Sequence, residues 1–217
     1  VYGNVFTTIA GYLYASRWVV EWVPFAATLL GMALVIASAC VFNNYLDRNI
    51  DAKMERTKNR AIAAGRVGAS AAMIYGSTLL FFGFLFLYVY VNALTAFLAL
   101  FGHVWYVLVY GWGKRSSLWG TLIGSVAGSV PIVARYTGVV NSFDPVTAFI
   151  FLAMAFWQMP HFYAIAIYRH KDYVAAGIPT LPAQKGSLAT KWQMVLYIIE
   201  FTGVACFLVF IGAAGNT

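Results

Sequence analysis

Long runs of apolar residues separated by short polar segments dominate the sequence. The runs cover residues 2–16, 22–46, 70–91, 93–112, 118–138, 145–168 and 192–213. Most of them approach the ~20 residues that an α-helix needs to cross the hydrocarbon core of a bilayer. The pattern therefore predicts an all-α, polytopic transmembrane bundle with seven helices in this chain. No linker or soluble segment separates the runs, so we predict a single transmembrane domain over 1–217.

The composition and the placement of the basic residues agree with this prediction. The chain is 62% hydrophobic and 10% charged, whereas soluble domains average about 45–50% apolar and about 25% charged residues. All 14 Lys and Arg residues except Arg17 and Arg135 follow the second, fourth or sixth run. Because Lys and Arg accumulate in cytoplasmic loops, these three connections are predicted to lie on the cytoplasmic side.

The net charge of +7 is thus concentrated at one face of the predicted bundle. Such a face suits anionic membrane lipid headgroups or an anionic substrate. Nucleic acid is excluded as a partner, because the aromatic residues lie inside the apolar runs. A single-strand binding surface would instead interleave them with exposed basic residues.

Two polar stripes end the second and the sixth run. Asn43, Asp47 and Asp51 are spaced by four residues, and Tyr168 and Asp172 repeat that spacing. Residues four apart share one face of a helix. Carboxylates at a membrane boundary are costly without a cation, and oxygen ligands suit Mg²⁺ that also holds substrate phosphates. The stripes therefore predict a magnesium–diphosphate site, with a solvated, charged helix end as the alternative.

A third stripe lies at the end of the fourth run. Tyr106, Tyr110 and Lys114 are again four residues apart, and Arg115 follows. Cations that reach the same cavity would stabilise the negative charge that grows on a departing diphosphate. The alternative is an aromatic belt with snorkelling cations at the membrane interface.

The fifth run carries small residues at a helical spacing. Gly120, Gly124 and Gly128 are four apart, with Ser125 and Ser129 beside the last two. Small residues at this spacing let helices approach closely in lipid. We interpret this stripe as helix packing rather than chemistry.

The most distinctive uncharged motif is Trp157-Gln158-Met159-Pro160-His161-Phe162. Pro160 is predicted to kink the helix, which is tolerated in a membrane where a cavity or another group satisfies the backbone. His161 shares a face with Tyr168 and Asp172, about 16 Å deeper than Asp172 at 1.5 Å per residue. This imidazole is a buried, hydrogen-bonded structural group, a ligand for haem iron, or a group that transfers a proton.

Together these motifs resemble those of the UbiA superfamily of intramembrane prenyltransferases, whose two acidic motifs bind Mg²⁺ and diphosphate. The chain resembles the first acidic motif and the middle basic motif at Asn43-Asn44-x-x-Asp47-x-x-x-Asp51 and Tyr110-x-x-x-Lys114-Arg115. The second acidic motif usually has two acids four residues apart, whereas here Tyr168 takes the place of the first. The superfamily usually has nine membrane helices, which implies that this prenyltransferase domain lacks the last two.

Within the superfamily, the segments 41–45, 54–60, 157–162 and 171–173 resemble the branch that farnesylates haem b. This implies transfer of a farnesyl group from farnesyl diphosphate. A haem vinyl group attacks the allylic cation, and water completes a hydroxyethylfarnesyl substituent. It also implies a bacterial inner membrane with the site at the cytoplasmic side.

The resemblance also implies roles for individual residues. Mg²⁺ is held by Asn43, Asp47, Asp51 and Asp172, which together with Lys114 form the expected catalytic set. The diphosphate is bound by Lys53, Arg56, Lys58, Lys114, Arg115 and Lys171. His161 is the expected contact of the haem iron.

Two other functions compete with this reading. A quinone-pathway aromatic prenyltransferase would share the diphosphate half of the site but take an aromatic acceptor, and the 157–162 motif argues against it. A transporter or channel is the alternative from another class, since polar stripes and broken helices also mark ion pathways.

Overall fold

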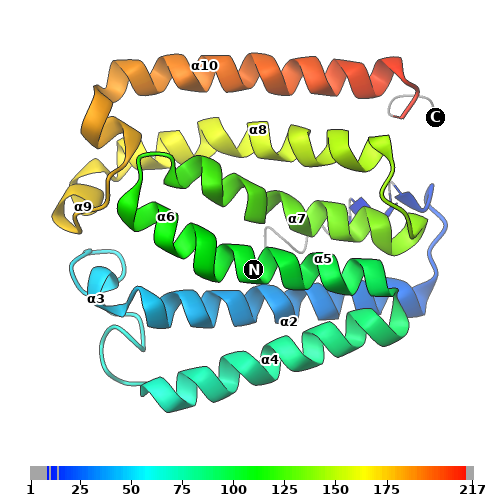
Figure 1. The fold of residues 1–217 in the computed structure, drawn as a ribbon, viewed down its shortest axis with the longest axis horizontal. Coiled ribbons are helices and arrows are strands. Elements are labelled where there is room, and N and C mark those ends of the chain that lie inside the picture. The colour runs from blue at the N-terminus through cyan, green and yellow to red at the C-terminus, as the bar shows by residue number, and fades with distance from the viewer. Residues whose placement is uncertain (1–8, 10, 14, 214–217) are drawn as a thin grey trace.

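The computed structural model describes residues 9, 11–13 and 15–213, and six helices in this part are long and apolar enough to cross a membrane. They run side by side in Figure 1. Five of them follow the predicted runs with small shifts at their ends. They are α2 (Trp22–Leu46), α4 (Ala69–Tyr90), the continuous stretch Ala93–Ser116, α7 (Gly120–Val140) and α8 (Pro145–Tyr168). The sixth is α10 (Leu181–Phe210). The predicted first span, 2–16, falls largely outside the described residues.

The stretch Ala93–Ser116 is not a uniform helix. It consists of α5 (Ala93–Val104), a π-helix η1 (Trp105–Tyr110) and α6 (Gly111–Ser116). Wide π turns occur mostly as local insertions in α-helices, often at functional sites. This one carries Tyr106 and Tyr110, two members of the third polar stripe.

The polar connections are more helical than predicted. Two short helices, α3 (Arg48–Asp51) and α9 (His170–Ala175), lie at the same end of the bundle, at the left in Figure 1. α10 begins at Leu181 instead of the predicted 192 and continues across a kink at Gly186, whose φ is +81°. Pro182 lies in the first turn of α10, where the missing N–H costs nothing. The polar connection 169–191 between the last two predicted runs therefore contains α9 and the start of α10.

Small residues set the closest helix contacts. A Cβ on Gly83 of α4 would lie 2.9 Å from the carbonyl oxygen of Gly31 on α2, so these two backbones touch. The buried side chains Met32, Val35 and Leu87 pack beside this contact. Close approach through small residues is the means by which membrane helices associate without a hydrophobic driving force.

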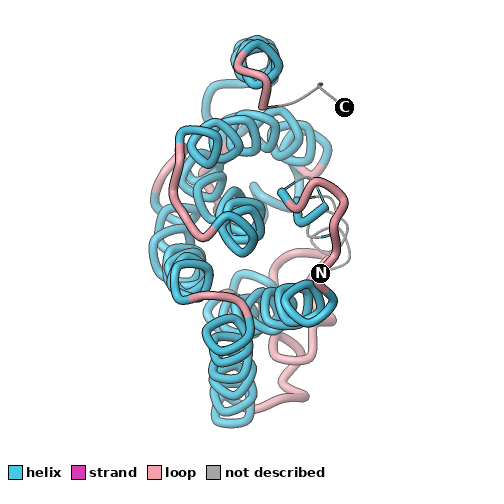
Figure 2. The backbone as a smooth tube through the Cα atoms, turned by 90° about the vertical axis from the view of Figure 1, so that its right-hand side faces the viewer, coloured by secondary structure: helices cyan, strands magenta, loops and turns pink. Residues whose placement is uncertain are grey.

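α7 packs against both α5 and α8, and the end-on view in Figure 2 shows the helices arranged around an interior. Its glycine stripe confirms the packing interpretation. A Cβ at Gly120 would lie 2.7 Å from the Lys114 Cα, and one at Gly124 would lie 2.8 Å from the Tyr110 ring. A Cβ at Gly128 would overlap the side chain of Gln158. Each glycine thus leaves room for a residue of the central cavity described below.

Candidate functional site

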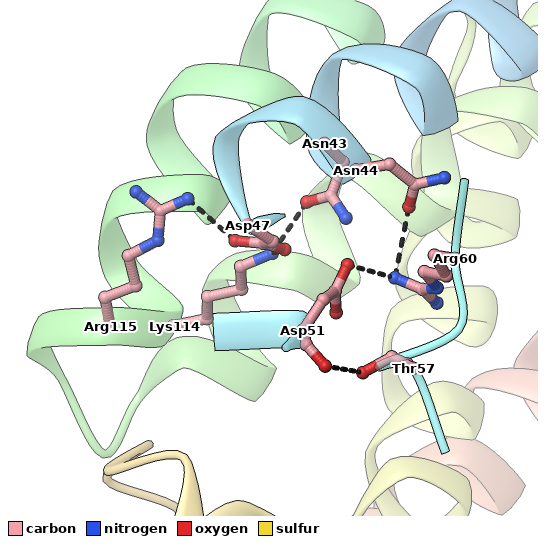
Figure 3. A network of polar contacts seen from close by, with 8 residues as sticks. All are labelled: Asn43, Asn44, Asp47, Asp51, Thr57, Arg60, Lys114 and Arg115. Atoms are coloured by element: carbon pink, nitrogen blue, oxygen red, sulfur yellow. Dashed lines mark hydrogen bonds and ion pairs between the residues drawn. The ribbon is translucent and has the colours of Figure 1, made fainter. Parts of the chain in front are cut away.

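Asp47, at the carboxyl end of α2, forms the centre of an ion-pair network with α6. Its side chain is paired with Lys114, and the Arg115 Nη2 lies 2.7 Å from its Oδ1 (Figure 3). The Lys114 Nζ also donates to the Asn43 Oδ1 at 2.6 Å. Asp47 is only 5% exposed. The first and third polar stripes of the sequence therefore meet, as predicted.

Asp51 forms a second network one helical turn further along. The Arg60 Nη1 donates to the Asp51 Oδ2 at 2.8 Å and to the Asn44 Oδ1 at 3.1 Å (Figure 3). The Thr57 hydroxyl donates to the Asp51 backbone carbonyl at 2.9 Å, which folds the loop back over α3. Asp51 is as buried as Asp47. Arg60 was not predicted as a site residue, because only the folded loop brings it to the carboxylate.

The donor atoms of this network suit a magnesium ion shared with a diphosphate. Asp47 and Asp51 supply carboxylate oxygens, and Asn43 and Asn44 supply amide oxygens beside them. In the described parts of the chain, no three His, Cys, Asp or Glu side chains cluster closely enough to hold a metal alone. Mg²⁺ in phosphate-transfer sites typically needs only one or two carboxylates, since phosphates and waters complete the octahedron. The residues present fit that kind of site.

Several predicted site residues do not join the network. The side chains of Lys53, Arg56, Lys58 and Lys171 are exposed, and Lys58 is paired with Glu55 at 2.7 Å. Asp172, on α9, is partly exposed and makes no hydrogen bond or ion pair through its side chain within the described residues. Its neighbour Tyr173 nevertheless lines the central cavity. The second acidic motif thus lies at the mouth of the cavity, without a contact to the first.

A cavity of about 580 Å³ extends from the ion-pair network into the bundle. This volume falls within the range of small-molecule sites. Lys114 and Tyr173 line its polar end, together with the segment 178–180. Tyr106 and Tyr110 form part of the wall, with ring centroids 5.3 Å apart. Most of the remaining lining is apolar, including Met32, Val35, Ala99, Leu118, Val130 and Met154.

His161 lines this cavity from α8. Its ring stacks on Trp157 with centroids 5.5 Å apart and planes 10° apart. The side chain is exposed, and neither ring nitrogen has a hydrogen bond to any described residue. The alternative of a buried, hydrogen-bonded structural histidine is therefore wrong, and a ring nitrogen is free to bind a ligand.

His103 and Gln158 also line the cavity, although neither was predicted as a site residue. His103 is 7% exposed, and its Nδ1 has no hydrogen-bond partner within the described chain. The signal that could have identified it is its spacing. It precedes Tyr106, Tyr110 and Lys114 by three, seven and eleven residues, which continues their stripe toward the membrane centre.

The Arg60 contact leads to a first prediction. Arg60→Met should lower the unfolding temperature in detergent, because it leaves the buried Asp51 carboxylate without its cation. The loss should be about 1–2 kcal/mol, less than for a fully buried pair because the Arg60 side chain is 37% exposed. Lys58→Met removes an exposed pair with Glu55 and should change stability by less than about 0.5 kcal/mol. Equal shifts in the two variants would contradict the described network.

Three comparisons relate the chain to known proteins. The profile of the UbiA prenyltransferase family matches residues 4–217. The "Protoheme IX farnesyltransferase" of Edwardsiella ictaluri is 46% identical over 216 residues, which cover 99% of this chain and 73% of that protein. The protein of the same name from Yersinia pseudotuberculosis is 48% identical with the same coverage.

Solved structures agree on the fold. An apo UbiA homologue from Aeropyrum pernix K1 superimposes with a TM-score of 0.80 at 17% identity, over 100% of this chain and 82% of that one. A UbiA homologue from Archaeoglobus fulgidus bound to DMAPP and Mg²⁺ gives a TM-score of 0.74 at 12% identity, over 99% and 76%.

Proposed function

We propose that this chain, which belongs to the UbiA prenyltransferase family, transfers a farnesyl group from farnesyl diphosphate to a vinyl group of haem b. The observation that carries the proposal is the continuity of the two halves of the site. Lys114 pairs with the buried Asp47 and also lines the apolar cavity that contains His161. An anion bound at the network would therefore lie at the mouth of a space for its apolar tail. The similarity to two bacterial protoheme IX farnesyltransferases supports haem as the acceptor.

We assign the magnesium site to Asn43, Asp47 and Asp51, with Asp172 from the second motif. When bound, Mg²⁺ would neutralise charge that develops on the leaving diphosphate. In the structure, Lys114, Arg115 and Arg60 supply the positive charges that balance the carboxylates of Asp47 and Asp51.

The same cations are our candidates for diphosphate binding. An incoming diphosphate offers them more negative charge than a single carboxylate does, so Lys114 and Arg115 can turn from Asp47 to the substrate. Charge-assisted hydrogen bonds to the departing oxygens strengthen as the C–O bond breaks, which lowers the barrier. The exposed Lys53, Arg56, Lys58 and Lys171 are our further candidates for diphosphate binding.

The cavity wall protects the allylic cation and orients its partner. The apolar lining excludes water near the diphosphate, and the ring faces of Tyr106 and Tyr110 can stabilise a passing positive charge. His161 binds the haem iron through its unpartnered imidazole, which fixes the porphyrin in the cavity. A vinyl carbon of haem then forms the new bond to C1 of the farnesyl group, and the C–O bond to the diphosphate breaks.

The chain is a multi-pass integral membrane protein by its six long apolar helices and its family. We place it in the bacterial inner membrane, with the end that carries α3, α6 and α9 at the cytoplasmic face. The basic residues gathered there support this orientation and allow contact with anionic lipid headgroups.

The proposed function is tested by offering purified protein farnesyl diphosphate with three acceptors in parallel: haem b, an aromatic acid of the quinone-precursor type, and none. Separation of the pigments by chromatography should show a farnesylated haem and no prenylated aromatic acid. A prenylated aromatic acid as the main product would favour the quinone-pathway alternative. Ion flux in proteoliposomes without any prenylated product would favour a transporter.

Lys114→Met should affect the two substrates unequally. Lys114 lies at the ion-pair network, so we expect kcat/KM for farnesyl diphosphate to fall about 100-fold, the usual effect of removing one charge-stabilising donor. Haem binding, followed by titration of the Soret band, should change little, because His161 lies deeper in the cavity. Lys185→Met, an exposed lysine on α10, is the matched control. Equal losses of both substrates in Lys114→Met would contradict the layered arrangement.

A further inference from the structure

Both carboxylate oxygens of Asp47 are bound by cations of the chain itself. Lys114 pairs with the Oδ2, and the Arg115 Nη2 lies 2.7 Å from the Oδ1 (Figure 3). The Asp47 side chain is only 7% exposed, so solvent ions screen these pairs little. A divalent ion bound to the same carboxylate would lie close to both cations, which repel it. Asp47 is therefore blocked as a metal ligand while the two pairs persist.

The other oxygen atoms of the first acidic motif are held in the same way. The Arg60 Nη1 donates to the Asp51 Oδ2 at 2.8 Å and to the Asn44 Oδ1 at 3.1 Å. The Asn43 Oδ1 accepts a hydrogen bond from the Lys114 Nζ at 2.6 Å. Every side chain of this motif that we assign to the metal thus already contacts a positive charge of the chain.

The summed charge of the network favours an anion over a metal ion. Lys114, Arg115 and Arg60 face the carboxylates of Asp47 and Asp51, so these paired groups carry a net charge of +1. A cluster with a net positive charge attracts a diphosphate and repels a lone Mg²⁺. The free site is therefore expected to select the diphosphate first.

The cations have room to change partner. The side chains of Arg115 and Arg60 are 36% and 37% exposed. Lys114 is more buried, but it lines the polar end of the cavity. A diphosphate at the mouth of the cavity therefore lies within reach of Lys114, and it can draw Lys114 and Arg115 from Asp47 by rotation of their side chains.

We propose that these ion pairs are autoinhibitory: they exclude the metal from the free protein and release its ligands when the diphosphate binds. The inference rests on the proposed function, which supplies the diphosphate of the prenyl donor as the releasing ligand. Lys114 and Arg115 move to the phosphate oxygens, and the freed Asp47 carboxylate becomes a ligand for Mg²⁺ shared with the diphosphate. Such coupling is reciprocal, so each of the two ligands raises the affinity for the other.

The pairs also have a use between turnovers. They neutralise the carboxylates of Asp47 and Asp51 at the end of the bundle. Carboxylates at a membrane boundary are costly without a cation. The chain thus supplies the compensating charge itself until the substrate and the metal replace it.

The test measures the metal and the diphosphate separately on the purified chain in detergent. Mn²⁺ is the metal probe, because it suits the same octahedral oxygen sites as Mg²⁺ and is visible by electron paramagnetic resonance. In Arg115→Met, Mn²⁺ alone should bind about tenfold more tightly than in the wild type, since one repelling charge is gone. Inorganic diphosphate alone, followed by calorimetry, should bind about tenfold more weakly, since one charged donor is lost. Lys114→Met should shift both affinities in the same directions.

Opposite shifts for the two ligands distinguish an autoinhibitory contact from a structural role, which would weaken both. Lys185→Met, at an exposed position on α10, is the matched control and should leave both affinities unchanged. If Lys114→Met fails to fold, judged by size-exclusion chromatography, Arg115→Met decides. Mn²⁺ binding to folded Arg115→Met that is no tighter than to the wild type would overturn the proposal. The titrations contain no haem, so opposite shifts in a protein that forms no farnesylated haem would overturn the proposed function alone.

Discussion

Asp47→Asn is expected to lower farnesyl transfer about 1000-fold while the protein stays folded. Asparagine keeps the size of the side chain but removes the negative charge that would hold Mg²⁺. Loss of one preorganised electrostatic group typically costs about 100- to 1000-fold, and Asp47 additionally positions both Lys114 and Arg115. The measurement is the rate of farnesyl haem formation in detergent at saturating substrates. Retention of more than a tenth of the wild-type rate would contradict its assignment.

Two controls separate charge from folding. Glu55→Gln removes the charge of a nearby acid whose side chain is 77% exposed, and it should leave the rate unchanged. Asp47→Ala removes the carboxylate that pairs with Lys114, whose side chain is only 13% exposed. A largely buried positive charge without its partner should destabilise the protein. The double variant Asp47→Ala/Lys114→Met should recover part of that stability without recovering activity. Recovery of activity would show that the carboxylate serves only to neutralise the lysine.

His161→Ala is expected to change the Soret spectrum of bound haem and to weaken haem binding by about tenfold or more. The imidazole lines the cavity, is held by its stack on Trp157, and has no competing hydrogen bond within the described residues. It is thus available to the iron, and loss of groups that support a metal typically costs about 10- to 100-fold in affinity. The measurement is a haem titration followed by absorbance.

His170→Ala is the matched control, because His170 lies exposed on α9. It should leave both the spectrum and the affinity unchanged. Binding of magnesium diphosphate to His161→Ala should also persist, since His161 has no contact with the network around Asp47. An unchanged Soret band in His161→Ala would remove the residue from haem binding. A combined loss of haem and diphosphate binding would indicate that the α8 segment around Pro160 positions the second motif.

Much of the fold could be predicted because lipid imposes a simple rule on sequence. A spanning helix must be apolar along about 20 residues, so five long helices match the predicted runs within a few positions. The rule fails where helix continues outside the apolar region. The start of α10, from Leu181 to Lys191, lies in a polar segment before the apolar run and contains the kink at Gly186. The short helices α3 and α9 lie outside the apolar runs, so the hydrophobic pattern does not predict them.

The site was predictable where its residues repeat along one helix. The spacing of Asn43, Asp47 and Lys114 within their stripes placed them at the same end of the bundle, and they are in contact. Arg60 and Gln158 follow no such repeat. Arg60 reaches Asp51 only because the loop after α3 folds back, and the amide of Gln158 is oriented by two serines on another helix. Such contacts depend on tertiary packing, which spacing alone does not specify.

The most direct test of the account is the mass of the haem product formed from deuterium-labelled farnesyl diphosphate, with and without Mg²⁺. The account predicts one new pigment in the presence of Mg²⁺. Its mass should exceed that of haem b by the labelled farnesyl group and one hydroxyl group. Chelation of Mg²⁺ should abolish it, and Asp47→Asn should behave like the chelated sample. Release of diphosphate without label in the haem fraction, or labelled haem formed equally well without Mg²⁺, would contradict the account.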